Sequence, residues 1–190
     1  TGYGQQKLNL AHMTQANGWA VNSQLTATLL NQETGAYVRG FEAYDDPDLR
    51  SSNPNPEAYR DAWAMRASSE WVKDQLTLKP YLRRSQMTFL QHFLPGQPLE
   101  ENEQTSGGLI VAYAIDAGDT SANVGGQIEL MSGALTEFQE GPTVGSAFLV
   151  ATRPAGLHYD YDVDSQLIAG FYDLQHRVTD SFRVLHSLRL

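Results

Sequence analysis

The 190-residue sequence contains no cysteine, which excludes disulfide bonds and zinc sites built from thiolates. It is also poor in positive charge, with 13 Lys and Arg against 22 Asp and Glu and a formal net charge of -9. Because binding to nucleic-acid phosphates depends mainly on Lys and Arg, we expect no nucleic-acid binding through this segment. The richest basic stretch, residues 79–84, is typical of a solvated strand end.

Long apolar runs are missing as well. No run approaches the roughly 18 consecutive apolar residues that a membrane-spanning helix needs, so we expect a soluble chain without a membrane span. The sequence starts at Thr1 rather than Met, from which we expect a processed or excised piece. The simplest organisation is one domain over residues 1–190, with residues 1–20 as an arm or an extended N-terminal segment.

One stretch has the spacing of an α-helix. Asn55, Pro56 and Glu57 offer an N-cap, a proline at the first helical position and an early carboxylate. The apolar or small residues that follow at helical spacing are Ala58, Ala62, Met65, Ser69 and Val72. This pattern predicts a helix near 56–73.

Most of the remaining chain has short apolar-rich segments between turn residues, which is typical of β-strands. The predicted strands include 25–30, 37–41, 76–79, 87–93, 108–115, 127–131, 147–151, 157–164 and 182–190. A turn at 33–35 is predicted to join the first two of these into a hairpin. Many short strands with one inserted helix predict an all-β fold, an antiparallel β-sandwich or barrel, of which the sandwich is preferred. In such a fold we expect Trp19, Trp63 and Trp71 to lie mostly in the core.

Signatures of catalysis are scarce. The sequence has no phosphate-binding P-loop, dinucleotide fingerprint, nucleophile elbow or HExxH pair. Its five histidines show no metal-ligand spacing, and nothing indicates an organic cofactor. A hydrolase with carboxylates as acid and base, for example Glu70 or Asp160, is left open, but an enzyme is the less favoured class.

Acidic side chains form the strongest candidate site. The sequence HYDYDVDS places Asp160, Asp162 and Asp164 in alternation, as in the first half of a calcium-binding loop. The two later positions that such a loop reserves for Gly and Glu hold Ser165 and Phe171. A standard EF-hand is therefore excluded.

The same segment is also predicted to be a strand. A period of two then puts His158 and the three aspartates on one face, with Tyr161 and Val163 directed inward on the other. A row of carboxylates on one face must be solvated, bound to a divalent ion or paired with cations. Two further aspartates, Asp116 and Asp119, follow the apolar strand 108–115, and a third acidic group lies at 45–48. The candidate calcium ligands are Asp160, Asp162, Asp164, Asp116 and Asp119.

Residues 108–150 carry a resemblance to a known family. The run GGLIVAYAIDAGD, then GQIELM, a polar stretch and AFLV resembles the second half of the jelly-roll coat proteins of icosahedral viruses. Asp116 and Asp119 would occupy the acidic turn of such a coat, and the helix near 56–73 would match one inserted between early strands. The resemblance implies a jelly-roll-like β-sandwich that self-assembles in a virion through sheet faces and loops, with calcium at subunit contacts.

Two other function classes stay open. The first is a carbohydrate- or ligand-binding β-sandwich with an acidic calcium site, and the second is the hydrolase with paired carboxylates. Coat proteins that package RNA usually carry a basic arm, and this chain has none. Self-association with other copies of the chain is the expected partnership.

Overall fold

The computed structural model describes residues 2–35, 38 and 40–190. They form eight strands and two short helices, in the order β1 (Tyr3–Ala16), β2 (Trp19–Glu33), α1 (Pro47–Arg50), β3 (Tyr59–Lys73), β4 (Leu76–Leu90), β5 (Leu99–Ala117), β6 (Thr120–Gln139), α2 (Ala147–Thr152), β7 (Gly156–Thr179) and β8 (Phe182–Arg189). In the described ranges, no helix is long and apolar enough to cross a membrane.

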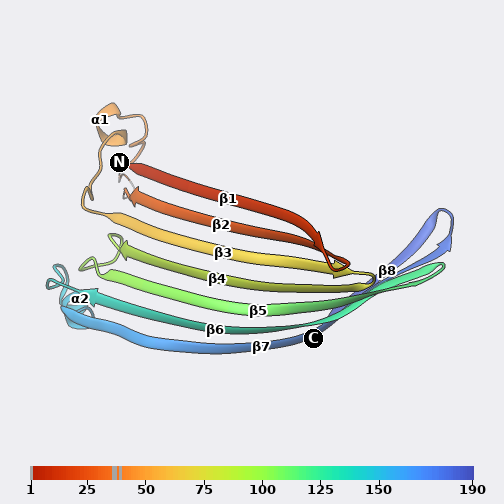
Figure 1. The fold of residues 1–190 in the computed structure, drawn as a ribbon. Helices are drawn as coiled ribbons and strands as arrows, with labels where there is room; N and C mark the ends of the chain where they lie inside the picture. The colour runs from red at the N-terminus through yellow and green to blue at the C-terminus, as the bar shows by residue number, and fades with distance from the viewer. Residues whose placement is uncertain (1, 36–37, 39) are drawn as a thin grey trace.

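All eight strands lie in one sheet, in the order of the chain, and each pairs antiparallel with the next. Figure 1 shows a single curved layer with short turns at one end and long connections, which carry α1 and α2, at the other. The hairpins β5–β6 and β7–β8 project beyond the other turns. The predicted all-β antiparallel class is confirmed. The strands form one layer in chain order, whereas a jelly roll would have two sheets facing each other.

The short turns explain why consecutive strands pair. Asn17 and Gly18 link β1 to β2 with φ values of 51° and 80°, the left-handed conformation that a two-residue hairpin turn requires. Asp74 and Gly118 have φ values of 50° and 68° at the β3–β4 and β5–β6 turns. These turns fix the strand register, and the register decides which side chains share a face.

The prediction of a helix near 56–73 is wrong, because residues 59–73 of this segment form β3. Trp63, Met65 and Trp71 also fit a period of two, and that pattern lets them share one face beside β2 and β4. Because the residues between them are small, the sequence fits the spacing of a helix as well as that of a strand. Hydrogen bonding to β2 on one side and β4 on the other makes the segment a strand. Asn55 does not cap a helix; its carbonyl accepts the Ala58 N–H in a turn.

Other local predictions also differ from the structure. Residues 147–151 belong to α2, because the Ser146 side chain caps the helix by accepting the Leu149 N–H. The segment 76–90 is one strand that runs through Pro80, where two separate strands were expected. The predicted hairpin turn at 33–35 leads to residues 36, 37 and 39, which lie outside the described residues. The strands at 108–115, 127–131, 157–164 and 182–189 are confirmed.

The sheet has no thick apolar core among its described residues. The buried apolar residues are small, namely Ala43, Ala58 and Pro98. The expectation that the tryptophans lie in the core is wrong for Trp71, which is 42% exposed. A single layer has two open faces, so its apolar side chains have no opposing layer against which to pack.

Candidate functional site: two faces and a loop network

The register divides the strand residues between two faces. One face carries all three tryptophans, and we call it the tryptophan face. The opposite face carries Arg60, Arg66, Arg83 and Arg189, and we call it the arginine face. The two faces therefore carry different side chains, a difference that the overall composition does not reveal.

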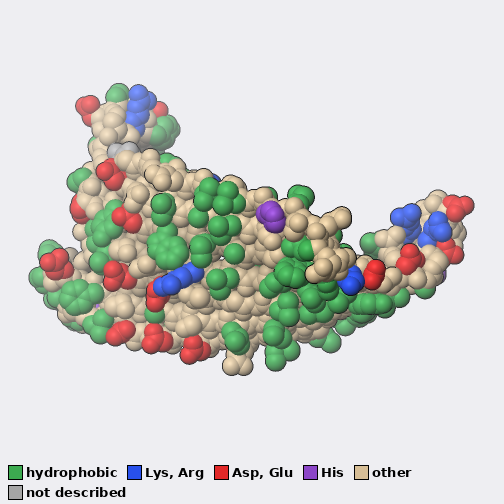
Figure 2. All heavy atoms as spheres, viewed as in Figure 1, with side chains coloured by type: hydrophobic (Ala, Val, Ile, Leu, Met, Phe, Trp, Pro, Cys, Tyr) green, Lys and Arg blue, Asp and Glu red, His purple; other side chains and the backbone are tan. Residues whose placement is uncertain are grey.

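The tryptophan face has an apolar belt, interrupted toward the loop end by Arg84, which is opposite Met65 and 3.8 Å from Glu103. On β3 the belt runs from 63 to 71, between Asp61 and Lys73, and on β7 it runs from 166 to 174, between Asp164 and His176. Large belt residues on the other strands are Leu8, Leu10, Val21, Leu25, Leu29, Leu78, Leu82, Leu109, Val111, Ile115, Val124, Ile128, Leu130, Val184 and Leu188. In the space-filling view of Figure 2, hydrophobic side chains gather most densely on the half nearest the short turns.

The belt is open to its surroundings. Ile128 is 55% exposed and Ile168 is 83% exposed, and many of the other large belt residues are at least a third exposed. An apolar surface of this extent marks a site of contact with a protein, a membrane or another apolar phase.

Aromatic residues mark the belt margin nearest the short turns. Trp19 and Trp71 meet edge to face there, with ring centroids 6.3 Å apart, and Tyr113 and Tyr172 occupy the same margin on β5 and β7. Trp63 lies nearer the loop end and donates its indole N–H to Gln86 at 3.1 Å. Tyr and Trp combine an apolar ring with a polar group, which suits a boundary between apolar and wet surroundings.

The predicted aspartate row lies on the tryptophan face, beyond the belt. Asp160, Asp162 and Asp164 pair with Thr136, Ala134 and Ser132 of β6, so the prediction that they share one strand face is confirmed. The expected inward packing of the alternate residues is wrong: Tyr161 is 47% and Val163 43% exposed, because no second layer covers the arginine face here. Figure 2 shows acidic side chains toward the loop end.

The other candidate calcium ligands lie at the opposite end of the sheet. Asp116 pairs with Ser121 beside the β5–β6 turn. On β6, Ser121 is 15 residues from Thr136, the partner of Asp160, which corresponds to roughly 50 Å of strand. Asp119 forms an ion pair with Arg177, whose Nη2 and Nε donate to Oδ1 at 2.7 and 2.9 Å.

The structure therefore does not bring the acidic groups together. Asp46, from the third group, is the N-cap of α1 and accepts the N–H groups of Asp48 and Leu49. Across the described ranges, no three His, Asp or Glu side chains are grouped closely enough to hold a metal ion. The two carboxylates named for a hydrolase lie on opposite faces, since Glu70 is on the arginine face, 3.5 Å from Lys79 Nζ.

The arginine face carries a connected polar cluster that the sequence analysis missed. Tyr81 donates its hydroxyl to Glu129 Oε2 at 2.5 Å, and Arg83 Nη2 donates to Glu129 Oε1 at 2.5 Å. Gln127 Nε2 donates to the Tyr81 hydroxyl at 2.6 Å, and Gln127 Oε1 accepts from Arg189 Nη2, also at 2.6 Å. The alternation of Lys79, Tyr81 and Arg83 in the sequence is the signal that could have indicated this face.

This cluster shifts two pKa values in opposite directions. The Tyr81 hydrogen bond, followed by the charge of Arg83, lowers the pKa of Glu129, although desolvation acts against them. Partial burial, followed by the hydrogen bond to the Glu129 carboxylate, raises the pKa of Tyr81. Glu129 is thereby held as a carboxylate and Tyr81 as a neutral donor.

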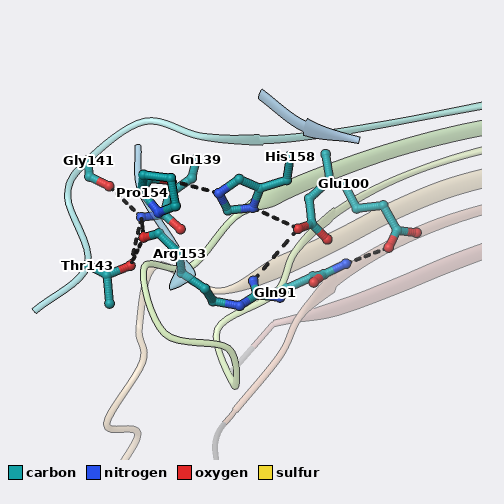
Figure 3. A network of polar contacts seen from close by, with 9 residues as sticks. Gln91, Glu100, Gln139, Gly141, Thr143, Arg153, Pro154 and His158 are labelled. Atoms are coloured by element: carbon teal, nitrogen blue, oxygen red, sulfur yellow. Dashed lines mark hydrogen bonds and ion pairs between the residues drawn. The ribbon is translucent and has the colours of Figure 1, made fainter. Parts of the chain in front are cut away.

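A second polar network fastens the β6–β7 connection to the loop end of the sheet (Figure 3). Glu137 is 4% exposed, and its Oε1 lies 2.9 Å from His158 Nδ1 and 3.7 Å from Arg153 Nη1. His158 Nε2 lies 2.7 Å from the carbonyl oxygen of Pro154. The two ring nitrogens of His158 thus face oxygen atoms on either side, one from the Glu137 side chain and one from the backbone of residue 154.

Gln139 is the buried centre of the same network. Its side-chain Nε2 donates to the Gly141 carbonyl at 2.7 Å and to Thr143 Oγ1 at 2.9 Å. The β4–β5 loop packs against the Gln139 amide through Gly96, which leaves no room for a Cβ. Gln91 donates to Glu100 Oε2 at the base of that loop. These contacts hold the two long loops to one another and to the sheet.

Comparison of the sequence with known protein families finds no match, and a search of curated proteins finds no similar chain. The resemblance to viral coat proteins and the calcium site therefore stay predictions.

Proposed function

We propose that this sheet is a membrane-crossing wall, in which the strands cross a lipid bilayer with the tryptophan face against the acyl chains. The arginine face then borders a water-filled path for solutes. The apolar belt that crosses one face of this single-layered sheet carries this proposal.

The length of the belt supports contact with the hydrocarbon of a bilayer. A strand needs about 9–11 residues to cross it when tilted. The belt segment from 63 to 71 is nine residues long, and the one from 166 to 174 is also nine. Charged residues bound each segment at the loop end, and Lys73 bounds the first at the turn end.

The aromatic margin and the polar arginine face agree with the same orientation. Tyr and Trp concentrate where hydrocarbon meets the headgroups. The arginine face carries ion pairs and hydrogen-bonded amides at the level of the belt, such as the Tyr81–Glu129–Arg83 cluster, which need contact with water.

The backbone pairing adds a requirement at the sheet edges. In hydrocarbon every backbone N–H and C=O must be paired within the protein. Among the described strands, β1 has one neighbour, and residues 156–169 of β7 have none on the side of β8. The proposal therefore includes further strands at both edges, from another copy or another segment, and this keeps strand-to-strand association as part of the function.

The position of a single tryptophan tests the proposal. In a background with Trp19, Trp63 and Trp71 replaced by Phe, Ile128→Trp places the probe on the belt and Gln127→Trp places it on the arginine face. In vesicles whose lipids carry bromine in the acyl chains, we expect strong fluorescence quenching for Ile128→Trp and little for Gln127→Trp. Aqueous iodide should give the reverse order.

Equal quenching of both variants by iodide, with none by brominated lipid, would overturn the proposal. That result would favour the soluble domain expected from the sequence. Circular dichroism of both variants checks that the strand content is unchanged.

A further inference from the structure

Two arginines lie directly opposite each other on the arginine face. Arg66 of β3 pairs with Arg83 of β4 in the strand register, and both side chains are exposed. Like charges directly opposite each other on adjacent strands destabilise a sheet. The arrangement is notable in a chain whose acidic residues outnumber its basic ones by 22 to 13.

The two charges are neutralised unequally. Arg83 donates through Nη2 to Glu129 and lies over the Tyr81 ring, 5.0 Å from its centroid. Arg66 has no ion pair or side-chain hydrogen bond within the part of the chain that the structure describes. The pair therefore keeps an uncompensated positive charge at Arg66, with Arg83 held in place beside it.

Hydroxyl groups extend this pair on both sides. Thr26 of β2 is opposite Arg66, and Ser106 of β5 is opposite Arg83, so all four residues form one row across the sheet. Ser106 is 2% exposed, and its Oγ has no hydrogen bond within 3.5 Å, although it lies near enough to help lower the pKa of Glu129. Because Ser106 is buried beside Glu129, its hydroxyl supports that carboxylate, and Thr26, which is half-buried, is the hydroxyl of the row that a solute can reach.

We propose that the row Thr26–Arg66–Arg83 binds the oxyanion group of a small solute, a phosphate or a carboxylate. A guanidinium binds such groups through two parallel N–H donors, so Arg66 supplies the principal contact. Arg83 contributes charge and the donors that Glu129 does not use, and the hydroxyl of Thr26 supplies a neutral donor. Glu129 restricts the ligand to the Arg66 side, because its carboxylate repels a second anion.

The site needs only an arginine face in contact with water, so it can be tested without a bilayer. In detergent micelles, calorimetric titration with inorganic phosphate and separately with succinate measures binding and distinguishes the two ligand classes. We expect saturable binding of at least one anion by the wild-type protein. Arg66→Gln should weaken it about tenfold or more, as expected for loss of a bidentate charged contact.

Arg84→Gln is the matched control, because Arg84 follows Arg83 in the chain but lies on the tryptophan face, 3.8 Å from Glu103. It should leave the affinity within about twofold of wild type. Arg66→Lys keeps the positive charge but lacks the two parallel N–H donors of the guanidinium, so we expect a loss of affinity intermediate between wild type and Arg66→Gln. This variant keeps the test informative if Arg66→Gln does not fold. Equal weakening by Arg66→Gln and Arg84→Gln, or no saturable binding to wild type by about 10 mM anion, would overturn the site. Either result leaves the lipid-quenching test unaffected.

Discussion

At the scale of the residue, side-chain partners determine charge on the arginine face. Glu129 could be read from the sequence only as one of 22 acidic residues. The structure gives it a phenol and a guanidinium as donors, and together they lower its pKa. Its partners Tyr81 and Arg83 come from β4, 48 and 46 residues away along the chain, so no local motif indicates them.

Replacing Tyr81 by Phe should remove the largest cause of the low Glu129 pKa. A carboxyl with a lower pKa in the folded state contributes stability above its unfolded pKa, and this contribution is lost as pH falls through the folded pKa. We therefore expect Tyr81→Phe to lower the free energy of unfolding near neutral pH by about 1.5 kcal/mol. The difference from wild type should shrink as the pH falls.

Denaturant unfolding at several pH values checks this, and NMR titration of the Glu129 carboxyl should show its pKa higher than in wild type. Tyr161→Phe is the control, because Tyr161 is 47% exposed and no hydrogen-bond partner of its side chain is observed in the described residues. A loss of stability that is independent of pH would argue against the hydrogen bond as the cause.

At the scale of the element, pairing partners overrode local preference. The segment 56–73 fits a helix and a strand almost equally well by its own spacing, and β2 and β4 on either side make it a strand. At 147–151, where a strand was predicted, the Ser146 hydroxyl caps the N-terminus of a helix. The long loops are held by contacts between elements, such as Gln139 against Gly96, that no single segment displays.

Alanine at two glycines separates loop packing from backbone strain. Gly96 and Gly118 both have positive φ, at 81° and 68°, but a Cβ at Gly96 would overlap the Gln139 amide, while a Cβ at Gly118 meets open space. We expect Gly118→Ala to cost about 1–2 kcal/mol of unfolding free energy from backbone strain alone. Gly96→Ala should cost clearly more and speed hydrogen exchange in residues 140–155.

Equal effects of the two substitutions on stability and on exchange would contradict the proposed packing of the two loops. Exchange in β1 serves as the internal reference, because both glycines are far from that strand in the sheet order.

At the scale of the whole molecule, charge is arranged in zones. The tryptophan face has an apolar belt, and the acidic row Asp160, Asp162 and Asp164 lies beyond it at the loop end. The low overall charge density of the sequence does not reveal this separation. A face that is apolar in one zone and acidic in the next can contact two different environments at once.

The acidic row gives a prediction about ions. Neighbouring carboxylates repel one another, so replacing all three aspartates by Asn should stabilise the calcium-free protein by a few tenths to about 1 kcal/mol at low salt. If calcium binds the row, it should raise the melting temperature of wild type, and EDTA should reverse the rise. The triple variant should respond to neither.

Asp173→Asn, on the arginine face of the same strand, controls for a general change of charge. Melting temperature and oligomer size that are unaffected by calcium, chelator and substitution would dispose of the calcium prediction.

The sequence by itself determined the all-β antiparallel class, the strand at 157–164 and the shared face of its three aspartates. These follow from alternation, which is a local property of extended backbone. The tertiary structure alone decided that eight strands form one layer, that 56–73 joins it, and that Asp116 and Asp119 lie far from Asp160. The physical reason is that the strand register depends on many weak side-chain and turn preferences along whole strands. A face becomes apolar or charged only when neighbouring strands pair in one register.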